Sequence, residues 1–197
     1  MKRLFDLLFS LVGLLILSPF FILLSLLILV TMGWPIFYRQ IRVGRGGREF
    51  KIIKFRSMVK NAEKRGLPVT TGGDRRITPI GRFLRRTKLD ELPQLLNVVS
   101  GDMSLVGPRP EVPKYVTLYD DRQRQVLSVR PGLTDPASIV YRHEEKILAR
   151  YPDTEKAYIE VLMPAKLLLN LAYIEKQSFC RDLALIGRTL RKIFSSR

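Results

Sequence analysis

The chain has 197 residues, with 34 Lys and Arg against 18 Asp and Glu, which gives a formal net charge of +16. Its single cysteine, Cys180, cannot form an intrachain disulfide, and its single histidine, His143, cannot build a histidine-rich zinc site. These counts exclude a disulfide scaffold and a zinc finger. The excess of positive charge indicates an anionic partner, and lipid headgroups, a phosphate-bearing substrate and nucleic acid all qualify. We expect no nucleic-acid partner, because the sequence contains no helix-turn-helix, RNP aromatic pair or zinc module.

Residues 7–32 form a run without any charged side chain. A helix of this length rises about 1.5 Å per residue and could cross a bilayer core of about 30 Å. Ser18 and Pro19 stand near its middle, where a proline removes a backbone donor and kinks or breaks a helix. Each half would then suit one leaflet better than the whole bilayer.

The charges around this run bear on its topology. Lys2 and Arg3 precede it and several arginines follow it, and such residues favour the cytoplasmic side of a membrane. The sequence therefore predicts a re-entrant helix-break-helix over residues 1–35, with membrane phospholipids as a partner. A spanning anchor and a cleaved signal peptide are the alternatives, although the sequence has no small-residue cleavage site.

The remainder, residues 36–197, is charged like a solvated domain. The stretches 36–43 and 49–55 are strand-like and separated by a Gly-rich turn, which predicts a β-hairpin. Thr78 followed by Pro79 is a start signal for a helix. From Glu144 onward the pattern is helical, so the fold class that we expect is α+β, with a small hairpin and a mainly helical cytoplasmic domain.

The last helices carry apolar stripes over residues 167–174 and 183–193, interleaved with Lys and Arg. Such amphipathic helices can lie in a membrane interface. The alternative is that they cover the core of the domain.

Asp90 and Glu91 are an adjacent acidic pair among basic segments. We expect Asp90 to cap a helix that has Pro93 in its first turn. A helix N-terminus and nearby cations favour the charged form, so this carboxylate should be ionised at neutral pH and usable as a nucleophile or a Mg²⁺ ligand. The alternative is that Asp90, Glu91 and Leu92 form an ordinary helix cap and have no catalytic role.

Several motifs in order carry a resemblance to a known family. They are a basic-flanked apolar segment with Ser18-Pro19, then "FKIIKFRSM", then "RRTKLDELPQLLNVVSGDMSLVGPRP", then "VRPGLT". The sequence resembles the bacterial monotopic phosphoglycosyl transferases, the bacterial sugar transferase family, in a minimal catalytic-domain form. The resemblance implies a re-entrant membrane helix broken at Ser18-Pro19, and an active site on the cytoplasmic face of the bacterial inner membrane.

The resemblance also implies an activity. Such an enzyme moves a sugar 1-phosphate from a UDP-sugar donor to polyprenyl phosphate, usually undecaprenyl phosphate, with Mg²⁺, and releases UMP. Asp90 would be the nucleophile that forms a covalent phosphosugar intermediate. Glu91 would be its partner as a metal ligand or proton handler, so both carboxylates are candidate metal ligands.

The same resemblance assigns basic residues to nucleotide and phosphate binding. An arginine fork can bind two phosphate oxygens at once, and Arg109 stands between two prolines that would stiffen its presentation. The five expected phosphate-binding residues are Lys54, Arg56, Arg85, Arg109 and Arg142. For any one of them, a solvated or lipid-facing charge is the alternative.

One departure from the family pattern concerns Asp135 and Pro136, which stiffen the loop after "VRPGLT" and add a carboxylate. If this loop reads the sugar, specificity taken from other members is in doubt. The alternative function is a catalytically inactive membrane module that recruits glycan-assembly proteins. The sequence leaves the sugar, the final glycan and the oligomeric state open, with a homodimer as one candidate.

Overall fold

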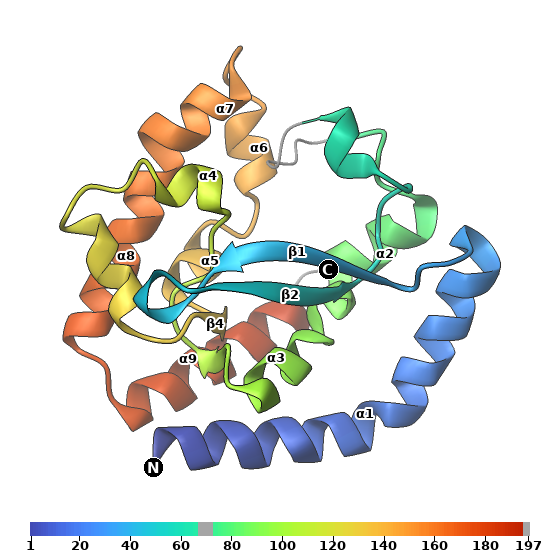
Figure 1. Cartoon of the computed structure of the whole chain (residues 1–197), viewed down its shortest axis with the longest axis horizontal. Coiled ribbons are helices and arrows are strands. Elements are labelled where there is room, and N and C mark those ends of the chain that lie inside the picture. The colour runs from blue at the N-terminus through green and yellow to red at the C-terminus, as the bar shows by residue number, and fades with distance from the viewer. Residues whose placement is uncertain (67–72, 195–197) are drawn as a thin grey trace.

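The structure is a computed structural model that describes residues 1–66 and 73–194. It combines helices with two small sheets, which confirms the α+β class (Figure 1). The strands are β1 (Phe37–Val43), β2 (Glu49–Phe55), β3 (Ser104–Val106) and β4 (Gly132–Thr134). The α-helices are α1 (Lys2–Met32), α2 (Pro79–Thr87), α3 (Gln94–Ser100), α4 (Pro113–Val116), α5 (Pro136–Val140), α6 (Glu144–Leu148), α7 (Thr154–Ala157), α8 (Met163–Glu175) and α9 (Phe179–Phe194). Shorter 3-10 turns are η1 (Arg45–Gly47), η2 (Ala62–Arg65), η3 (Leu89–Glu91) and η4 (Gln123–Ser128), and a π-helical turn, η5 (Tyr158–Leu162), joins α7 to α8.

Helix α1 is one continuous helix with Pro19 inside it, and Figure 1 shows it bending between its two halves. Proline has no N–H to donate to the carbonyl four residues earlier, which is that of Leu15. The Ser18 hydroxyl donates to this carbonyl at 2.8 Å and replaces the missing bond. The expected break is therefore a bend, because the local hydrogen bonding is repaired by the residue next to the proline.

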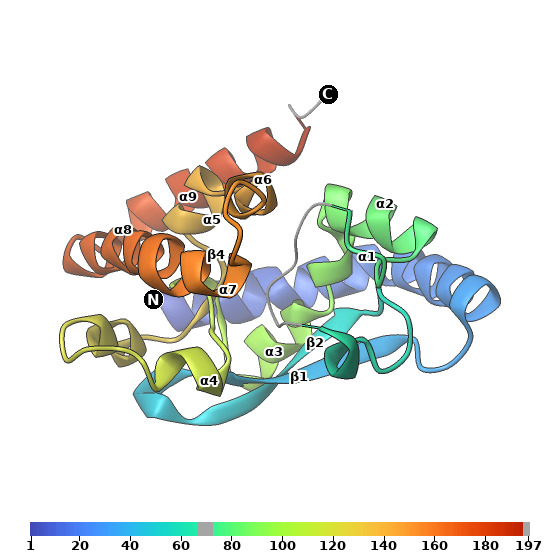
Figure 2. The same ribbon diagram turned by 90° about the horizontal axis from the view of Figure 1, so that it is seen from above.

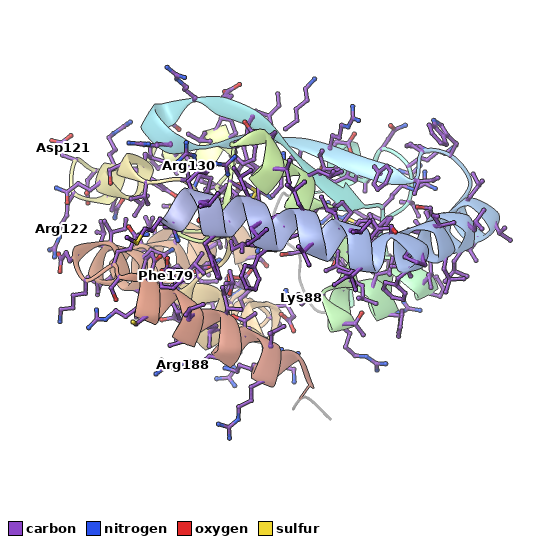
Figure 3. The ribbon with its side chains drawn as sticks, turned by 90° about the horizontal axis from the view of Figure 1, so that it is seen from below. Lys88, Asp121, Arg122, Arg130, Phe179 and Arg188 are labelled. Atoms are coloured by element: carbon purple, nitrogen blue, oxygen red, sulfur yellow. The ribbon has the colours of Figure 1, made fainter. Side chains whose placement is uncertain are left out.

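The beginning of α1 is fastened to the rest of the molecule by polar contacts. Lys2 forms an ion pair with Asp182 of α9. Arg3 donates to two backbone carbonyls at the end of α3, at 2.6 and 3.1 Å. Asp6 is 2% exposed and accepts from the Ser104 hydroxyl of β3 at 2.8 Å. Figure 3 shows α9 beside this half of α1.

The end of α1 is held by the other side of the same body. Arg56, just after β2, donates from Nη2 to the carbonyls of Met32 and Gly33, both at 2.6 Å. A buried apolar cluster joins α1 to β2 and α2 through Leu24, Ile28, Phe55 and Leu84. Both ends of α1 therefore contact one folded unit.

The predicted hairpin is confirmed, because β1 pairs antiparallel with β2 from Phe37 opposite Phe55 to Val43 opposite Glu49. A second pairing was not predicted: β3 and β4 are parallel. The two chains pass very close there. A Cβ atom on Gly132 would lie 2.1 Å from the backbone nitrogen of Gly107, so this crossing requires glycine.

The later helices divide into a core and a surface element. In α8, Leu167 and Leu171 are buried in the main apolar cluster, whereas Leu168 is exposed. In α9, Leu183 and Leu190 are exposed. The core alternative therefore applies to α8, and α9 leaves part of its apolar stripe uncovered. Figure 2 shows α5–α9 on one side of the molecule and α2 on the other, with the hairpin running along the lower edge of the view.

Two helical stretches in the described part of the chain are long and apolar enough to cross a membrane by length and composition, α1 and residues 154–175. They differ in burial. Only 11% of the most apolar window of α1 is buried, against 44% for the second stretch. The second stretch packs in the protein core, so α1 is the segment that presents an uncovered apolar surface.

Candidate active site

The acidic pair lies on a tight connection between two helices. Helix α2 begins as predicted, with the Thr78 hydroxyl accepting from the Gly81 N–H at 3.0 Å, and ends at Lys88 in a left-handed conformation. The 3-10 turn η3 follows at once and carries Asp90 and Glu91, which are 5% and 8% exposed. The predicted cap is wrong: within the residues that the structure describes, Asp90 makes no capping hydrogen bond, because the tight turn places it before the start of α3.

Glu91 is held by two cations from different segments. Arg109 binds its carboxylate bidentately: Nη1 donates to Oε2 at 3.0 Å and Nη2 donates to Oε1. Lys54 of β2 lies 3.3 Å from the same Oε1. Burial alone would raise the pKa of Glu91, but the charges of Arg109 and Lys54 outweigh it and hold this pKa well below its ordinary value. Glu91 is thus an anion fixed in place.

The charge of Lys54 is less strongly stabilised than the charges of Arg109 and Glu91. Burial lowers the pKa of Lys54 to about 8, although the carboxylate of Glu91 partly restores it. A lysine in this condition still carries its charge at neutral pH.

Asp90 has a different environment from Glu91. Burial, with the neighbouring charge of Glu91, raises the pKa of Asp90. Lys54, Lys88 and Arg85 favour the charged form, as expected, but desolvation outweighs them in this carboxyl. Within the described residues, its Oδ1 is buried and has no hydrogen-bond partner. A poorly solvated carboxylate oxygen without a donor is suited to attack an electrophile or to bind a cation.

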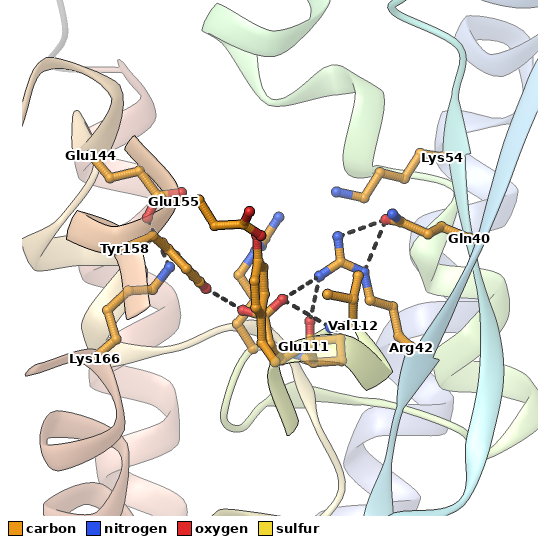
Figure 4. A network of polar contacts seen from close by, with 12 residues as sticks. Gln40, Arg42, Lys54, Glu111, Val112, Glu144, Glu155, Tyr158 and Lys166 are labelled. Atoms are coloured by element: carbon orange, nitrogen blue, oxygen red, sulfur yellow. Dashed lines mark hydrogen bonds and ion pairs between the residues drawn. The ribbon is translucent and has the colours of Figure 1, made fainter. Parts of the chain in front are cut away.

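The segment that carries Arg109 is clamped by a polar network (Figure 4). Arg42 of β1 donates to the Pro110 carbonyl and to Glu111 Oε1, both at 3.1 Å, and its other nitrogens donate to Gln40. Tyr158 donates to Glu111 Oε2 from the C-terminal helices. The network thus ties the Arg109 segment to both sides of the molecule.

Sequence reasoning missed this network, since its members are far apart in the chain and belong to no motif that we recognised. It also missed Gln94, which is 1% exposed and whose amide atoms lack hydrogen-bond partners among the described residues. Its position in "DELPQ", four residues after Asp90, was the signal that could have found it.

The structure brings together some of the residues predicted to bind phosphate. Lys54 and Arg109 contact Glu91 of the Asp90–Glu91 dyad directly, and the charge of Arg85 acts on Asp90. Arg56 instead contacts the end of α1, and Arg142 donates to the Lys192 carbonyl in α9. Phosphate binding by all five stays a prediction.

Asp135, the departure from the family pattern, is fully buried. Its carboxylate accepts from the Ser138 N–H at 3.0 Å and from the Ser138 hydroxyl, and so caps α5. Pro136 occupies the first turn of that helix. The departure therefore builds a helix start and does not present a carboxylate to a substrate.

A divalent cation would find few protein ligands here. No group of three or more His, Cys, Asp or Glu side chains that could hold a metal occurs in the part of the chain that the structure describes. Mg²⁺ commonly takes one or two carboxylates and completes its shell with water and substrate phosphates. The unpartnered Oδ1 of Asp90 beside Glu91 fits that pattern of donors.

Comparison with known proteins identifies the family. The model of the bacterial sugar transferase family matches residues 1–196, and the chain belongs to this family.

Three relatives show how the family is named. The chain is 34% identical over 199 residues to a UDP-N-acetylgalactosamine-undecaprenyl-phosphate N-acetylgalactosaminephosphotransferase of Aeromonas hydrophila, covering 98% of this chain and 44% of the relative. It is 32% and 33% identical to UDP-glucose:undecaprenyl-phosphate glucose-1-phosphate transferases of Escherichia coli (strain K12) and Caulobacter vibrioides. These two matches cover 100% and 99% of this chain, and 41% and 70% of the relatives. The chain thus spans less than half the length of two of these three relatives.

Proposed function

We propose that this protein is a phosphoglycosyl transferase that moves a sugar 1-phosphate from a UDP-sugar to polyprenyl phosphate, usually undecaprenyl phosphate, and releases UMP. The observation that carries the proposal is the Asp90–Glu91 turn held against Lys54 and Arg109, in a chain that belongs to the bacterial sugar transferases. The reaction would start the assembly of a membrane glycan such as an exopolysaccharide, capsule, O-antigen or glycoprotein glycan.

The covalent route fits the two different carboxyls. A carboxylate oxygen of Asp90 attacks the β-phosphorus of the donor, the bond from this phosphorus to the UMP oxygen breaks, and UMP leaves with the electron pair. An oxygen of the polyprenyl phosphate then attacks the same phosphorus and releases the Asp90 carboxylate. Burial favours this role because it leaves Asp90 with fewer hydrogen bonds to break before it attacks.

The basic side chains and Mg²⁺ would bind and neutralise the phosphates of the substrates. Arg109 and Lys54 face the anionic Glu91 and can share their remaining donors with the phosphates of the donor substrate. Asp90 and Glu91 would hold Mg²⁺ together with substrate phosphate oxygens, and the ion would supply neutralisation of the charge that builds on the departing UMP.

We further propose a re-entrant placement of α1 in the bacterial inner membrane, with the active site at the cytoplasmic face. Three features support it: both ends of α1 contact the same folded body, the helix bends at Pro19, and its apolar surface is largely uncovered. A straight crossing would separate ends that polar contacts hold on one unit.

The activity is tested by UMP release from detergent-solubilised protein with Mg²⁺, undecaprenyl phosphate and a panel of UDP-sugars. We expect lipid-dependent UMP from one donor and none from Asp90→Asn, with Asp102→Asn as a control on an exposed aspartate. A covalent adduct on Asp90 should be visible by mass spectrometry when the lipid is omitted. A folded wild-type protein that releases no UMP from any donor would favour the recruiting-module alternative.

The topology is tested by single cysteines at positions 2 and 39 in a Cys180→Ser background, because Cys180 is exposed and would react. An impermeant thiol reagent should label both positions in inside-out vesicles and neither in right-side-out vesicles. Labelling of the two positions from opposite sides would contradict the re-entrant placement.

A further inference from the structure

Asn97 of α3 uses both halves of its side-chain amide on strand β2. Its Oδ1 accepts from the Ile53 N–H at 2.9 Å, and its Nδ2 donates to the Lys51 carbonyl at 2.9 Å. The side chain is buried, as Asn97 is 3% exposed. An amide that donates and accepts in this way imitates the peptide group of a neighbouring strand.

The position of this contact matters because β1 is the only strand that pairs with β2 among the described residues. Strand β1 pairs with one edge of β2, and Asn97 engages backbone groups of the residues on either side of Ile52. A two-point contact of this kind fixes the strand along its own length as well as holding it to the helix. It therefore sets the register of β2 over α3.

The register decides where Lys54 points. Ile52 and Lys54 are two residues apart, so their side chains leave the strand on the same face. Ile52 packs in a buried cluster with Val98 and Met103, and Lys54 reaches Glu91 at 3.3 Å. A slip of one residue would turn Lys54 to the opposite face and away from the dyad.

We propose that Asn97 is a positioning residue of the active site, which locks β2 onto α3 and so delivers the Lys54 ammonium to the carboxylate of Glu91. This inference rests on the proposed function for its consequence in catalysis. Its structural content, the placement of Lys54, does not depend on which reaction the site performs.

The variants are Asn97→Leu, which removes both hydrogen bonds at similar volume, and Asn97→Asp, which keeps the acceptor and replaces the donor. The matched control is Asn170→Leu, since Asn170 is also a buried asparagine on a helix and its Oδ1 contacts no partner in the described residues. If Asn97→Leu fails to fold, the isosteric Asn97→Asp carries the test.

The kinetic readout is the KM for the UDP-sugar, because a loss of folded protein lowers the rate without changing KM. We expect KM to rise about tenfold in the Asn97 variants, the size of one charge-assisted contact, and to be unchanged in Asn170→Leu. In a Lys54→Gln background the same Asn97 substitution should change KM less than about twofold, because both act through one contact. Equal effects in the two backgrounds would overturn the proposal.

A second readout needs no turnover. In Asn97→Leu, amide hydrogen exchange over residues 49–55 should accelerate at Ile53, and an amine reagent at fixed pH should label Lys54 faster relative to exposed Lys51. Unchanged exchange and labelling would overturn the proposal. If the wild type releases no UMP, the proposed function fails, while exchange and labelling still decide whether Asn97 places Lys54.

Discussion

Arg109 combines a stiff backbone segment with a charged contact to the acidic pair. It stands between Pro108 and Pro110, and the next residue, Glu111, is bound by Arg42 and Tyr158. Its guanidinium makes two parallel bonds to Glu91. A planar fork on a stiff segment offers a direction as well as a charge, which lysine cannot reproduce.

We therefore expect Arg109→Lys to lower kcat by roughly 10²-fold, comparable to the loss of one preorganised donor at a reacting group. UMP release under saturating donor measures it. Arg45→Lys is the control, because exposed Arg45 donates to the Ser128 carbonyl far along the chain from the dyad. A variant with Lys at position 109 that keeps near-native kcat would show that charge alone suffices.

Glu144 gives the residue-scale prediction for pH. Its carboxylate accepts from Lys166 at 2.8 Å, and although burial alone would raise its pKa, the charges of Lys166 and Arg109 hold the pKa of Glu144 below its ordinary value. A depressed pKa in the folded state means that the contribution to stability is complete above the unfolded pKa of about 4.3 and is lost as pH falls through the folded pKa.

Glu144→Gln should accordingly destabilise the protein at pH 7 by roughly 0.2–1 kcal/mol, a range suited to a pair that is partly solvated. The deficit should shrink as the pH falls below about 4.3, the pKa of a glutamate in the unfolded chain. Urea unfolding of the variant and of Glu145→Gln, on the same helix, measures it. A deficit independent of pH would mean that the Lys166 pair is not its source.

At the scale of elements, α1 depends on a few polar contacts near its beginning. Asp6 is buried and accepts from the Ser104 hydroxyl and from the Leu105 N–H at 3.3 Å. These bonds attach the helix to β3, the strand that leads into the Arg109 segment. Helix α1 and the site are thus connected through one short strand.

Asp6→Ala leaves the Leu105 N–H without its acceptor and should cost about 1–3 kcal/mol of stability. Asp6→Asn keeps one acceptor oxygen and should lose less. Denaturant unfolding in detergent micelles compares the three proteins. Equal stability of Asp6→Ala and the wild type would show that water replaces the carboxylate without penalty.

The elements that sequence could predict are those with local signals. The hairpin follows from alternating strand-like residues around a Gly-rich turn, and α2 follows from Thr78 and Pro79. The β3–β4 pairing could not be predicted, because each strand has three residues and their pairing depends on contacts across the chain.

The candidate site divides in the same way. The order of motifs pointed to the dyad, Lys54 and Arg109, which the structure brings together. The direction of the pKa shift of Asp90 could not be predicted, because it arises from burial by elements that are distant in sequence. Asn97, Glu111 and Tyr158 were missed for the same reason.

The whole molecule separates charge from apolar surface. It carries a net charge of +16, while α1 leaves large side chains uncovered, among them Leu15, Ile16 and Val30 at 76%, 70% and 84% exposure. For the membrane placement that we propose, we therefore expect two attachments: a hydrophobic one through α1 and an electrostatic one through Lys and Arg.

These two attachments respond differently to salt. At about 1 M salt the Debye length falls to about 3 Å, so the electrostatic part should be lost while the hydrophobic part remains. We expect the protein to stay in the membrane fraction after such a wash and to leave it only in detergent. Release by salt alone would mean that α1 is not embedded.

The ion pair between Lys2 and Asp182 joins residues 180 positions apart, and this spacing has a consequence for synthesis. At roughly 5–20 residues per second, a ribosome completes Asp182 about 9–36 s after Lys2. Until then the beginning of α1 lacks this partner. Before that point Arg3 can already contact the end of α3 and Asp6 can contact β3, so the ion pair made by α9, the last helix to be synthesised, is the last of these polar contacts to form.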